Sequence, residues 1–408
     1  MSSIQGPDTG PATQPSDWDR LRTIAPAPTP PPEQVHALEF TASGSEYFRI
    51  WIVNLLLTLV TFGLYYPWAK VRRLRYFYGN TRLAGHAFDF HGDPKRMLRG
   101  YLLVGALFAL YAFAGRVSPV AGVIALVILA AIWPALLRAS QRFRLAQTSW
   151  RGLRFRFTGD TAGAYKALAP GFVAAIVFVG VLTLAAPDEQ AAGRAAAVPG
   201  WLLPSIVMLT LVFYAALPYT LWLLKRYQHD HYQYANLRTR FTAGPGSFYL
   251  LALKTAALLV GAMVVVGVAF AIATVGAAGG RPGFGRFIFM AGVLLAAYAA
   301  VLFTLQPYIT SRLQNLVWSR TESRSLGFAS ALGFWPLVRL TALNWILVVL
   351  TLGLYWPFAA VATARMRLAA VSVSVRTDLD ALVARGAGTM NDAAGDAAAD
   401  LFDVDIGM

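Results

Sequence analysis

The sequence predicts an all-α polytopic membrane protein with six long transmembrane helices and two further hydrophobic segments that are related by repetition. Of the 408 residues, 57% are hydrophobic and only 13% are charged, and the mean hydropathy is +0.53. The chain is therefore far more apolar than an ordinary soluble domain. Apolar stretches also recur along the chain, and their length is close to the roughly 20 residues that a helix needs to cross a hydrocarbon core.

The two ends of the chain differ from its middle. Residues 1–35 are rich in proline and lack the apolar segment of a cleavable signal, and residues 376–408 contain seven Asp among Ala and Gly. Neither end has enough apolar surface to offset the entropy of ordering. We therefore expect disordered tails at 1–35 and 376–408, with a membrane domain containing internal repeats at 36–375.

Eight apolar segments lie between the tails, and the charge of their connectors predicts their orientation. The four connectors 70–99, 138–167, 225–247 and 310–333 hold 22 Lys and Arg, whereas the three alternate connectors hold 4. Because Lys and Arg are retained inside the cell, the basic connectors are predicted to be cytoplasmic. The apolar segments cover approximately residues 47–68, 97–114, 119–137, 168–186, 201–224, 248–277, 287–309 and 334–360.

The chain also repeats itself. A shift of 290 residues aligns Asn54–Arg75 with Asn344–Arg365 at ten identities in 22 positions, including Asn, Gly, Pro and Arg. Shared apolar composition would not align these residue types, so the match indicates an internal duplication. Shorter matches at offsets of 67 and 84 residues suggest a unit made of an apolar helix, a proline, a basic extension and a short alternating segment.

The alternating segments are typical of β-strands, in which side chains point to opposite faces with period two. If the predicted strands pair, they form a small cytoplasmic sheet beneath the membrane domain. They are His36–Thr41, His86–His91, Leu153–Thr158, Leu237–Thr242, Ser325–Ala329 and Val371–Val375.

The strands leave two alternatives for the first and last apolar segments. If every strand is cytoplasmic, each block between neighbouring strands must cross the membrane an even number of times, yet blocks 47–68 and 334–360 contain one segment each. These two segments are either re-entrant hairpins turning near Asn54 and Asn344, or plain spans seven and eight with one terminus outside. The polar Asn and the following Gly-Leu-Tyr-aromatic-Pro break favour hairpins.

The run Thr61–Tyr76, followed by Asn80-Thr81 and by Gly85-His86-Ala87-Phe88, resembles the YjgN family of bacterial inner-membrane proteins of unknown function. The second copy, Thr351–Pro357, is similar to the same pattern. The resemblance covers roughly residues 36–375 and implies a multi-pass fold in the bacterial inner (plasma) membrane. It implies no activity. At the second copy the sequence departs from the pattern, because Ala360, Ala362 and Thr363 replace basic residues.

A first functional hypothesis, which we favour slightly, is a transport or permeation-like protein. The two repeated segments would meet at the centre and line a path, as broken helices do in transporters. The candidate core and repeat-motif residues are Asn54, Gly63, Tyr65, Pro67, Trp68, Asn344, Gly353, Tyr355 and Pro357.

The alternative is a non-transporting envelope protein that binds anionic lipid, or a protein partner, through its basic cytoplasmic face. Basic and aromatic side chains at a bilayer surface favour anionic headgroups, although ordinary topology determination would explain the same residues. Nucleic acid is not expected, because the charges adjoin membrane segments. The candidate headgroup contacts are Lys70, Arg72, Arg73, Arg75, Arg142, Arg144, Lys225 and Arg226.

Enzymatic chemistry finds little support in the sequence. Every acidic residue between 47 and 375 falls in a connector, so a carboxylate proton relay within the membrane is not expected. No nucleophile elbow, P-loop or Rossmann glycine pattern is present, and we expect no enzyme and no cofactor. The absence of cysteine excludes disulfides and thiolate metal sites. We expect no metal site, with His86, His91, His229 and His231 as weak candidates only.

Overall fold

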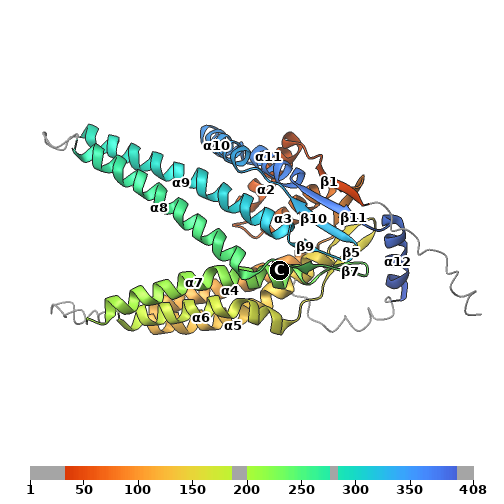
Figure 1. Ribbon diagram of the computed structural model, residues 1–408, viewed down its shortest axis with the longest axis horizontal. Coiled ribbons are helices and arrows are strands. Elements are labelled where there is room, and N and C mark those ends of the chain that lie inside the picture. Colours follow the sequence, from red (N-terminus) through yellow and green to blue (C-terminus); the bar gives the residue numbers. More distant parts are fainter. Residues whose placement is uncertain (1–32, 186–199, 276–283, 393–408) are drawn as a thin grey trace, which may run out of the picture.

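The computed structural model describes residues 33–185, 200–275 and 284–392, and within this part of the chain one order of elements occurs five times: strand, helix, helix, strand (Figure 1). Unit 1 consists of β1 (Gln34–Phe40), α2 (Gly44–Val60), α3 (Tyr66–Gly79) and β2 (Thr81–Leu83). Unit 2 consists of β3 (His86–Phe90), α4 (Pro94–Val117), α5 (Pro119–Ala146) and β4 (Thr148–Trp150). Unit 3 consists of β5 (Leu153–Phe157), α6 (Thr161–Ala185), α7 (Leu202–His229) and β6 (Tyr232–Tyr234). Unit 4 consists of β7 (Leu237–Arg238), β8 (Arg240–Phe241), α8 (Pro245–Val275), α9 (Phe284–Trp318) and β9 (Thr321–Glu322). Unit 5 consists of β10 (Leu326–Ser330), α10 (Phe334–Leu350), α11 (Trp356–Ala369) and β11 (Val371–Val375), and α12 (Leu379–Asp392) follows it.

Among the described residues, six helices are long and apolar enough to cross a membrane, namely α4 to α9. This confirms the predicted number of long apolar helices. Units 1 and 5 are smaller, because α2 and α10 have 17 residues each, and α3 and α11 have 14 each. A 17-residue helix is about 26 Å long, which is short for a hydrocarbon core of about 30 Å.

The first and last apolar segments each fold as a pair of helices, and their turn lies later than predicted. In unit 1 it lies at residues 61–65, beyond Asn54, which is in the middle of α2. Phe62 and Gly63 have φ of 49° and 90°, a left-handed conformation that glycine adopts without steric cost. The Thr61 hydroxyl accepts a hydrogen bond from the Tyr65 backbone N–H at 3.0 Å. Residues 351–355 turn in the same way.

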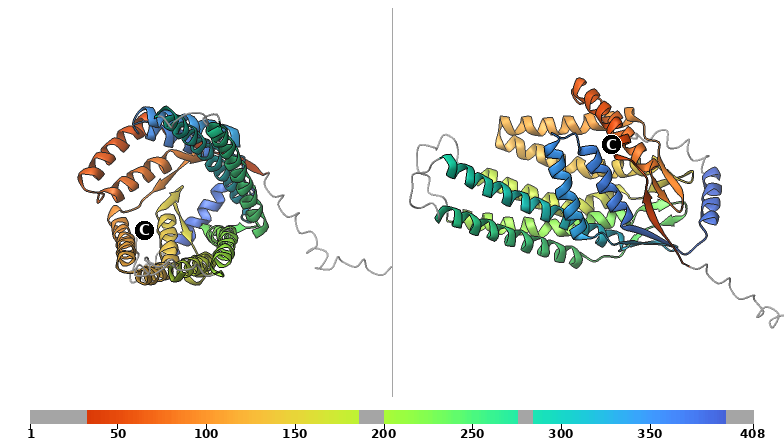
Figure 2. Two further views of the ribbon diagram at one scale, coloured as in Figure 1. Left: turned by 90° about the vertical axis from the view of Figure 1, so that its left-hand side faces the viewer. Right: turned by 90° about the horizontal axis from the view of Figure 1, so that it is seen from above.

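The ten helices of the five units form a closed ring. Each helix from α2 to α11 packs against the next along the chain, and α11 packs against α2. Viewed from the end of the molecule, the helices surround a central axis (Figure 2, left). In this ring the first and second helices of the units alternate.

The strands form a second ring, which adjoins the helix ring (Figure 1). All recorded pairings are antiparallel, and the strand order starts at β7 and ends at β8. Since only Thr239 separates β7 from β8, the order closes on itself. The two ends of the repeated region meet through β1 and β11, with Gln34 opposite Val375.

Observed strands lie within one or two residues of all six predicted segments, as β1, β3, β5, the β7–β8 pair, β10 and β11. The strands β2, β4, β6 and β9 were not predicted, because two or three residues are too few to show an alternation. Two-residue turns such as Ala84-Gly85 and Arg151-Gly152 join them to their neighbours, and all four turn residues have positive φ.

One backbone hydrogen bond closes the base of each helix pair. In unit 1 the N–H of Thr41, just before the first helix, donates to the carbonyl of Asn80, just after the second, at 2.9 Å. The corresponding bonds in the other described units run from His91 to Gln147, Thr158 to His231, Thr242 to Arg320 and Ala331 to Ala370, at 2.8 to 3.0 Å. Each helix pair is thus a closed loop standing on a strand pair.

A second set of hydrogen bonds joins each unit to the next. In all five described units, a side chain of the second helix donates to the carbonyl oxygen two residues before the first helix of the following unit. Unit 5 binds unit 1 in this way, although no covalent turn joins them. The bonds run from Arg75 to Gly92, Arg138 to Gly159, Trp222 to Ala243, Asn315 to Leu332 and Arg365 to Ala42, at 3.3, 2.9, 2.8, 3.0 and 2.7 Å.

Helix α12 lies across the end of the strand ring that is farther from the long helices (Figure 1). Leu382 is buried against Trp150, Leu153 and Tyr234, and Asp380 pairs with Arg151. The sequence predicts a disordered tail at 376–408, and this prediction is wrong for residues 379–392. Leu379, Leu382 and Val383 share one face of a helix, which the Asp-rich composition concealed. Residues 1–32 and 393–408 lie outside the described residues.

We expect Arg365→Met to destabilise the protein, because its guanidinium binds Ala42 across the junction that lacks a covalent turn. Loss of a charged hydrogen bond costs roughly 1.5–3 kcal/mol. Thermal unfolding in a zwitterionic detergent measures the change, with Arg324→Met on an exposed turn as the control. Equal melting temperatures for the two variants would show that this bond does not hold the ring closed.

Candidate functional site

The predicted headgroup residues divide into two sets. The first set interacts with groups of the chain itself. Arg75 binds the carbonyls of Phe90 and Gly92, Arg72 and Arg73 lie over the rings of Tyr65 and Phe77, and Arg226 lies over Trp222 and 3.5 Å from Asp230. Arg142 also makes interactions within the protein. These residues support the fold whatever else they bind.

The second set consists of Lys70, Arg144 and Lys225, which we call the inner cations. They lie on α3, α5 and α7, and α4 and α6 lie between these helices in the ring. Burial lowers the pKa of Lys70, and the positive charges of Arg144 and Arg73 lower it further. Arg144 is also within electrostatic range of Lys225. Side chains from alternate helices can approach each other only on the inner side of the ring, so these cations face its interior.

Tyrosines from distant units show that this interior lies next to the strands. Burial raises the pKa of Tyr232 on β6, and both Arg144 and Tyr78 are close enough to affect that pKa. Tyr78 belongs to α3 and stacks on Phe90, so groups from units 1, 2 and 3 approach one another here. Arg144 therefore lies where the helix ring meets the strand ring.

Two of the inner cations, Arg144 and Lys225, have neutral partners. Arg144 donates to Oε1 of Gln141 at 2.9 Å, and Lys225 donates to Oε1 of Gln228 at 3.2 Å. None of the ion pairs among the described residues involves Lys70, Arg144 or Lys225. Like charges that lie near one another disfavour their charged forms, and an anion between them would relieve this repulsion.

Sequence reasoning did not identify the glutamines. Gln141 and Gln314 each follow the proline of their helix, Pro134 or Pro307, by seven residues, and Lys225 follows Pro218 by seven. Both glutamines are buried, and Gln314 holds the guanidinium of Arg367 at 2.8 Å. Aligning the helices on their prolines would have revealed this polar position.

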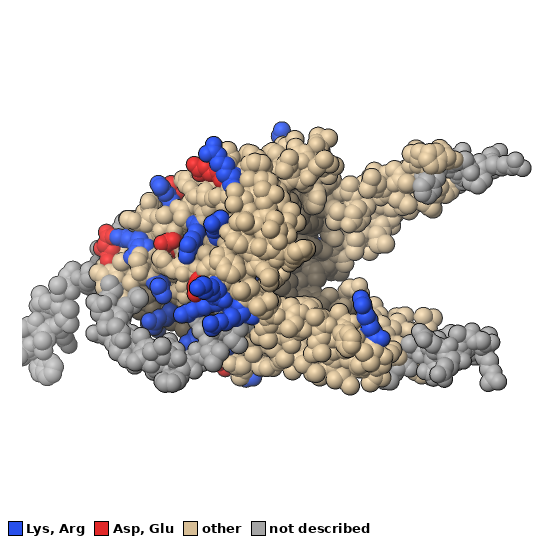
Figure 3. Space-filling model, turned by 180° about the vertical axis from the view of Figure 1, so that it is seen from behind, with Lys and Arg blue, Asp and Glu red and all other residues tan. Residues whose placement is uncertain are grey.

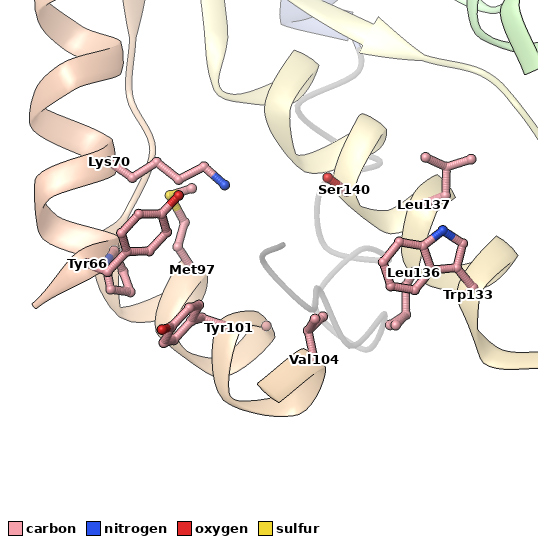
Figure 4. Close-up of a pocket in the computed structure, with 11 residues that line it drawn as sticks. Tyr66, Lys70, Met97, Tyr101, Val104, Trp133, Leu136, Leu137 and Ser140 are labelled. Carbon is pink, nitrogen blue, oxygen red and sulfur yellow. The ribbon is translucent and has the colours of Figure 1, made fainter. Parts of the chain in front are cut away.

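Lys70 also lines a cavity of about 270 Å³ between α3, α4 and α5 (Figure 4). Its ammonium group points across the cavity toward the side of Ser140, and the rings of Tyr66 and Tyr101 lie 5.4 Å apart on one wall. The remaining lining is mostly apolar. It consists of Pro67, Met97, Gly100, Val104, Trp133, Leu136 and Leu137.

Asn54 and Asn344 are both buried, and each lies in its own helix pair. The Nδ2 of Asn344 points to α11, 3.3 Å from the Thr363 hydroxyl and 3.5 Å from the Ala359 carbonyl. The Oδ1 of Asn54 is buried without a hydrogen-bond partner. These polar contacts of Asn344 lie within unit 5, and no hydrogen bond among the described residues joins Asn344 to Asn54.

The other repeat-motif residues shape the turns of units 1 and 5. Gly63 and Gly353 take positive φ, and Pro67 and Pro357 lie in the first turn of α3 and α11 and are fully buried. Tyr65 stacks on Trp68, and Tyr355 stacks on Phe358. All these contacts lie within a single helix pair.

The histidines have separate partners. His229 is buried 2.9 Å from the Thr321 hydroxyl, His91 contacts the Ser149 hydroxyl at 2.8 Å, and His231 lies 2.7 Å from the Tyr227 carbonyl. The backbone carbonyl of His86 accepts the Trp150 indole N–H at 3.1 Å. No group of three or more metal-ligating side chains occurs among the described residues.

Comparisons with known proteins agree with the resemblance seen in the sequence. A family model described as bacterial protein of unknown function, DUF898, matches residues 35–401. The chain is similar to proteins named inner membrane protein YjgN: 31% identical over 129 residues in Escherichia coli strain K12 and 32% over 123 residues in Salmonella typhimurium. These alignments cover 31% and 30% of this chain and 32% and 31% of the relatives, so about a third of their length is spanned. No solved structure matches.

Replacing Arg144 by Gln should raise the melting temperature by about 1–2 °C at low salt, because it removes one of three converging positive charges. Since the pKa of Lys70 is lowered in the folded protein, its repulsion acts below that pKa and is relieved as the pH rises through it. The gain from Arg144→Gln should therefore shrink at alkaline pH. Melting curves at two salt concentrations measure this, with Arg154→Gln as the control.

Proposed function

The chain belongs to the DUF898 family of bacterial proteins, and on that premise we propose that it is a six-span inner-membrane protein that binds an anionic ligand inside its helix ring. The observation that carries the proposal is that Arg144 acts electrostatically on both Lys70 and Lys225, cations of two other units, while no ion pair among the described residues involves any of the three. The names of the relatives support the inner membrane as its location.

The strand ring lies on the cytoplasmic side in this proposal. Lys and Arg side chains gather over the end of the molecule that holds the strands, and the long helices beyond it are largely uncharged (Figure 3). The basic connectors of the sequence become the strand hairpins and the adjoining helix ends. The positive-inside rule then places these hairpins in the cytoplasm.

Units 1 and 5 enter the cytoplasmic half of the bilayer without crossing it. Both helices of each unit start or end at the strand ring, so each pair returns to the side from which it came. The turns at the tips of these helix pairs are apolar and exposed. Phe62 is 97% exposed and Leu352 is 95% exposed, and their neighbours Val60 and Leu350 are also exposed. Exposed apolar tips of this kind favour insertion into lipid. Both termini are then cytoplasmic.

The shared strand–helix–helix–strand order of the five units supports the internal duplication inferred from the 290-residue repeat.

Transport is not part of the proposal. That hypothesis required the segments around Asn54 and Asn344 to line one path, and the polar contacts of Asn344 lie within its own helix pair. From the alternative hypothesis, which was binding of anionic lipid or a protein partner through the basic cytoplasmic face, we keep the anionic ligand and move its site to the inside of the ring.

Lipid insertion of units 1 and 5 can be tested in this naturally cysteine-free chain. A cysteine at Phe62 should resist a membrane-impermeant maleimide from either side, whereas one at Gly85, in the turn between β2 and β3, should react only from the cytoplasm. A nitroxide attached at Phe62 should be relaxed by dissolved oxygen, which partitions into lipid. Labelling at Phe62 from the periplasm would instead indicate a plain span.

Anion binding can be tested with inorganic pyrophosphate as the probe. We expect a purified triple variant, Lys70→Gln, Arg144→Gln and Lys225→Gln, to lose binding measured by calorimetry. The matched control Arg72→Gln, Arg226→Gln and Arg154→Gln removes the same charge elsewhere and should retain it. Equal loss in both variants would show that net charge alone attracts the probe.

The pH dependence of anion binding tests whether Lys70 is the titrating group of the site. A bound anion raises the pKa of Lys70 from its lowered free value, so affinity is full below the free pKa and falls as the pH rises toward the bound pKa. We expect this decline to begin below pH 10.5, the ordinary lysine value. Lys70→Arg keeps its charge and should flatten the decline. An unchanged decline in that variant would assign the titration to another group.

A further inference from the structure

We propose that the anionic ligand is a phospholipid, with its phosphate at Lys70 and part of an acyl chain in the cavity between α3, α4 and α5. This inference rests on the proposed function and names the ligand class of its site. The observation behind it is the joining of one inner cation to an apolar cavity between membrane helices.

The cavity has the polarity of an amphiphile. Lys70 is the one charged side chain that lines it, and its other polar side-chain groups are the hydroxyls of Tyr66, Tyr101 and Ser140 and the indole N–H of Trp133. On α4, Met97, Gly100, Tyr101 and Val104 follow the spacing of one helix face, so the wall continues along α4 for about 10 Å. A free inorganic anion would leave this apolar wall without a partner, and a lipid chain would cover it.

The depth of Lys70 in the bilayer suits contact with a lipid phosphate. Lys70 lies four residues, about 6 Å, beyond the first residue of α3, close to the apolar turn at residues 61–65. Arg72, Arg73 and Arg75 follow it toward the strand ring. A lysine at this depth is costly near hydrocarbon unless it meets an anion, and a phosphate provides one.

Within the described ring, a cation at this position of the second helix occurs in one of the five units. Lys70 follows Pro67 by three residues, and the same offset gives Leu137, Leu221, Thr310 and Ala360 in the other units. The second helix of unit 1 is therefore the one that brings a cation to this position. We expect one phospholipid at this site in each protein molecule.

Lipid selection can be measured with the full chain in detergent. Native mass spectrometry compares retention of phosphatidylglycerol, which is anionic, with that of phosphatidylcholine, which is neutral overall. We expect the wild type to prefer phosphatidylglycerol about fivefold, the effect of one lysine beside an anionic lipid. Lys70→Met should remove that preference, and Arg72→Met on the same helix should keep it.

The acyl-chain part of the proposal needs a second variant. Val104→Phe fills the cavity and should weaken retention of phosphatidylglycerol severalfold while pyrophosphate binding persists, and Val120→Phe, on an exposed position of α5, should change neither. Unchanged lipid retention in Val104→Phe would overturn the phospholipid assignment and leave the anion site standing. If the wild type shows no preference for phosphatidylglycerol and also fails to bind pyrophosphate, the proposed function is overturned as well.

Discussion

The ring depends on one repeated interaction, the hydrogen bond from the second helix of each unit to the backbone carbonyl two residues before the first helix of the next. This carbonyl lies at the corner between strand and helix. A strand that runs into a helix leaves carbonyl groups at the corner that no strand partner reaches, and buried carbonyls need donors. The donors differ in chemistry, from Arg and Trp to Asn, but they reach the same backbone position. Only Arg365 among these donors spans a junction without a covalent turn, so closure of the ring rests on it together with the β1 and β11 pair and the packing of α11 against α2.

Closure also decides which side chains can meet. Because first and second helices alternate around the ring, the inner faces of α3, α5 and α7 approach one another even though long helices separate them along the chain. Lys70, Arg144 and Lys225 occur at different offsets from their prolines, so their meeting does not follow from the repeat. The framework holds three like charges together, and its many hydrogen bonds supply the stability that such an arrangement removes.

Local patterns predicted much of the fold. The six long helices follow from apolar length, and the five strands of five or more residues, together with the β7–β8 pair, follow from alternation. The first and last apolar segments were predicted to be either hairpins or plain spans, and each folds as a helix pair. The turn was placed too early because a buried Asn suggested a break, whereas Thr61, Phe62 and Gly63 make one by capping and positive φ. Helix α12 was missed because three apolar residues, Leu379, Leu382 and Val383, are diluted by Asp and Ala.

The sequence by itself determined the long apolar helices, the longer alternating strands and where the positive charge lies, because these depend on periodicity and composition over neighbouring residues. The tertiary structure alone decided which basic residues serve the fold and which face the interior. Arg75 and Lys70 are five residues apart on one helix, yet Arg75 binds two carbonyls of the chain and Lys70 lines a cavity. That difference arises from the direction of each side chain relative to a ring that exists only when the first and last strands have paired.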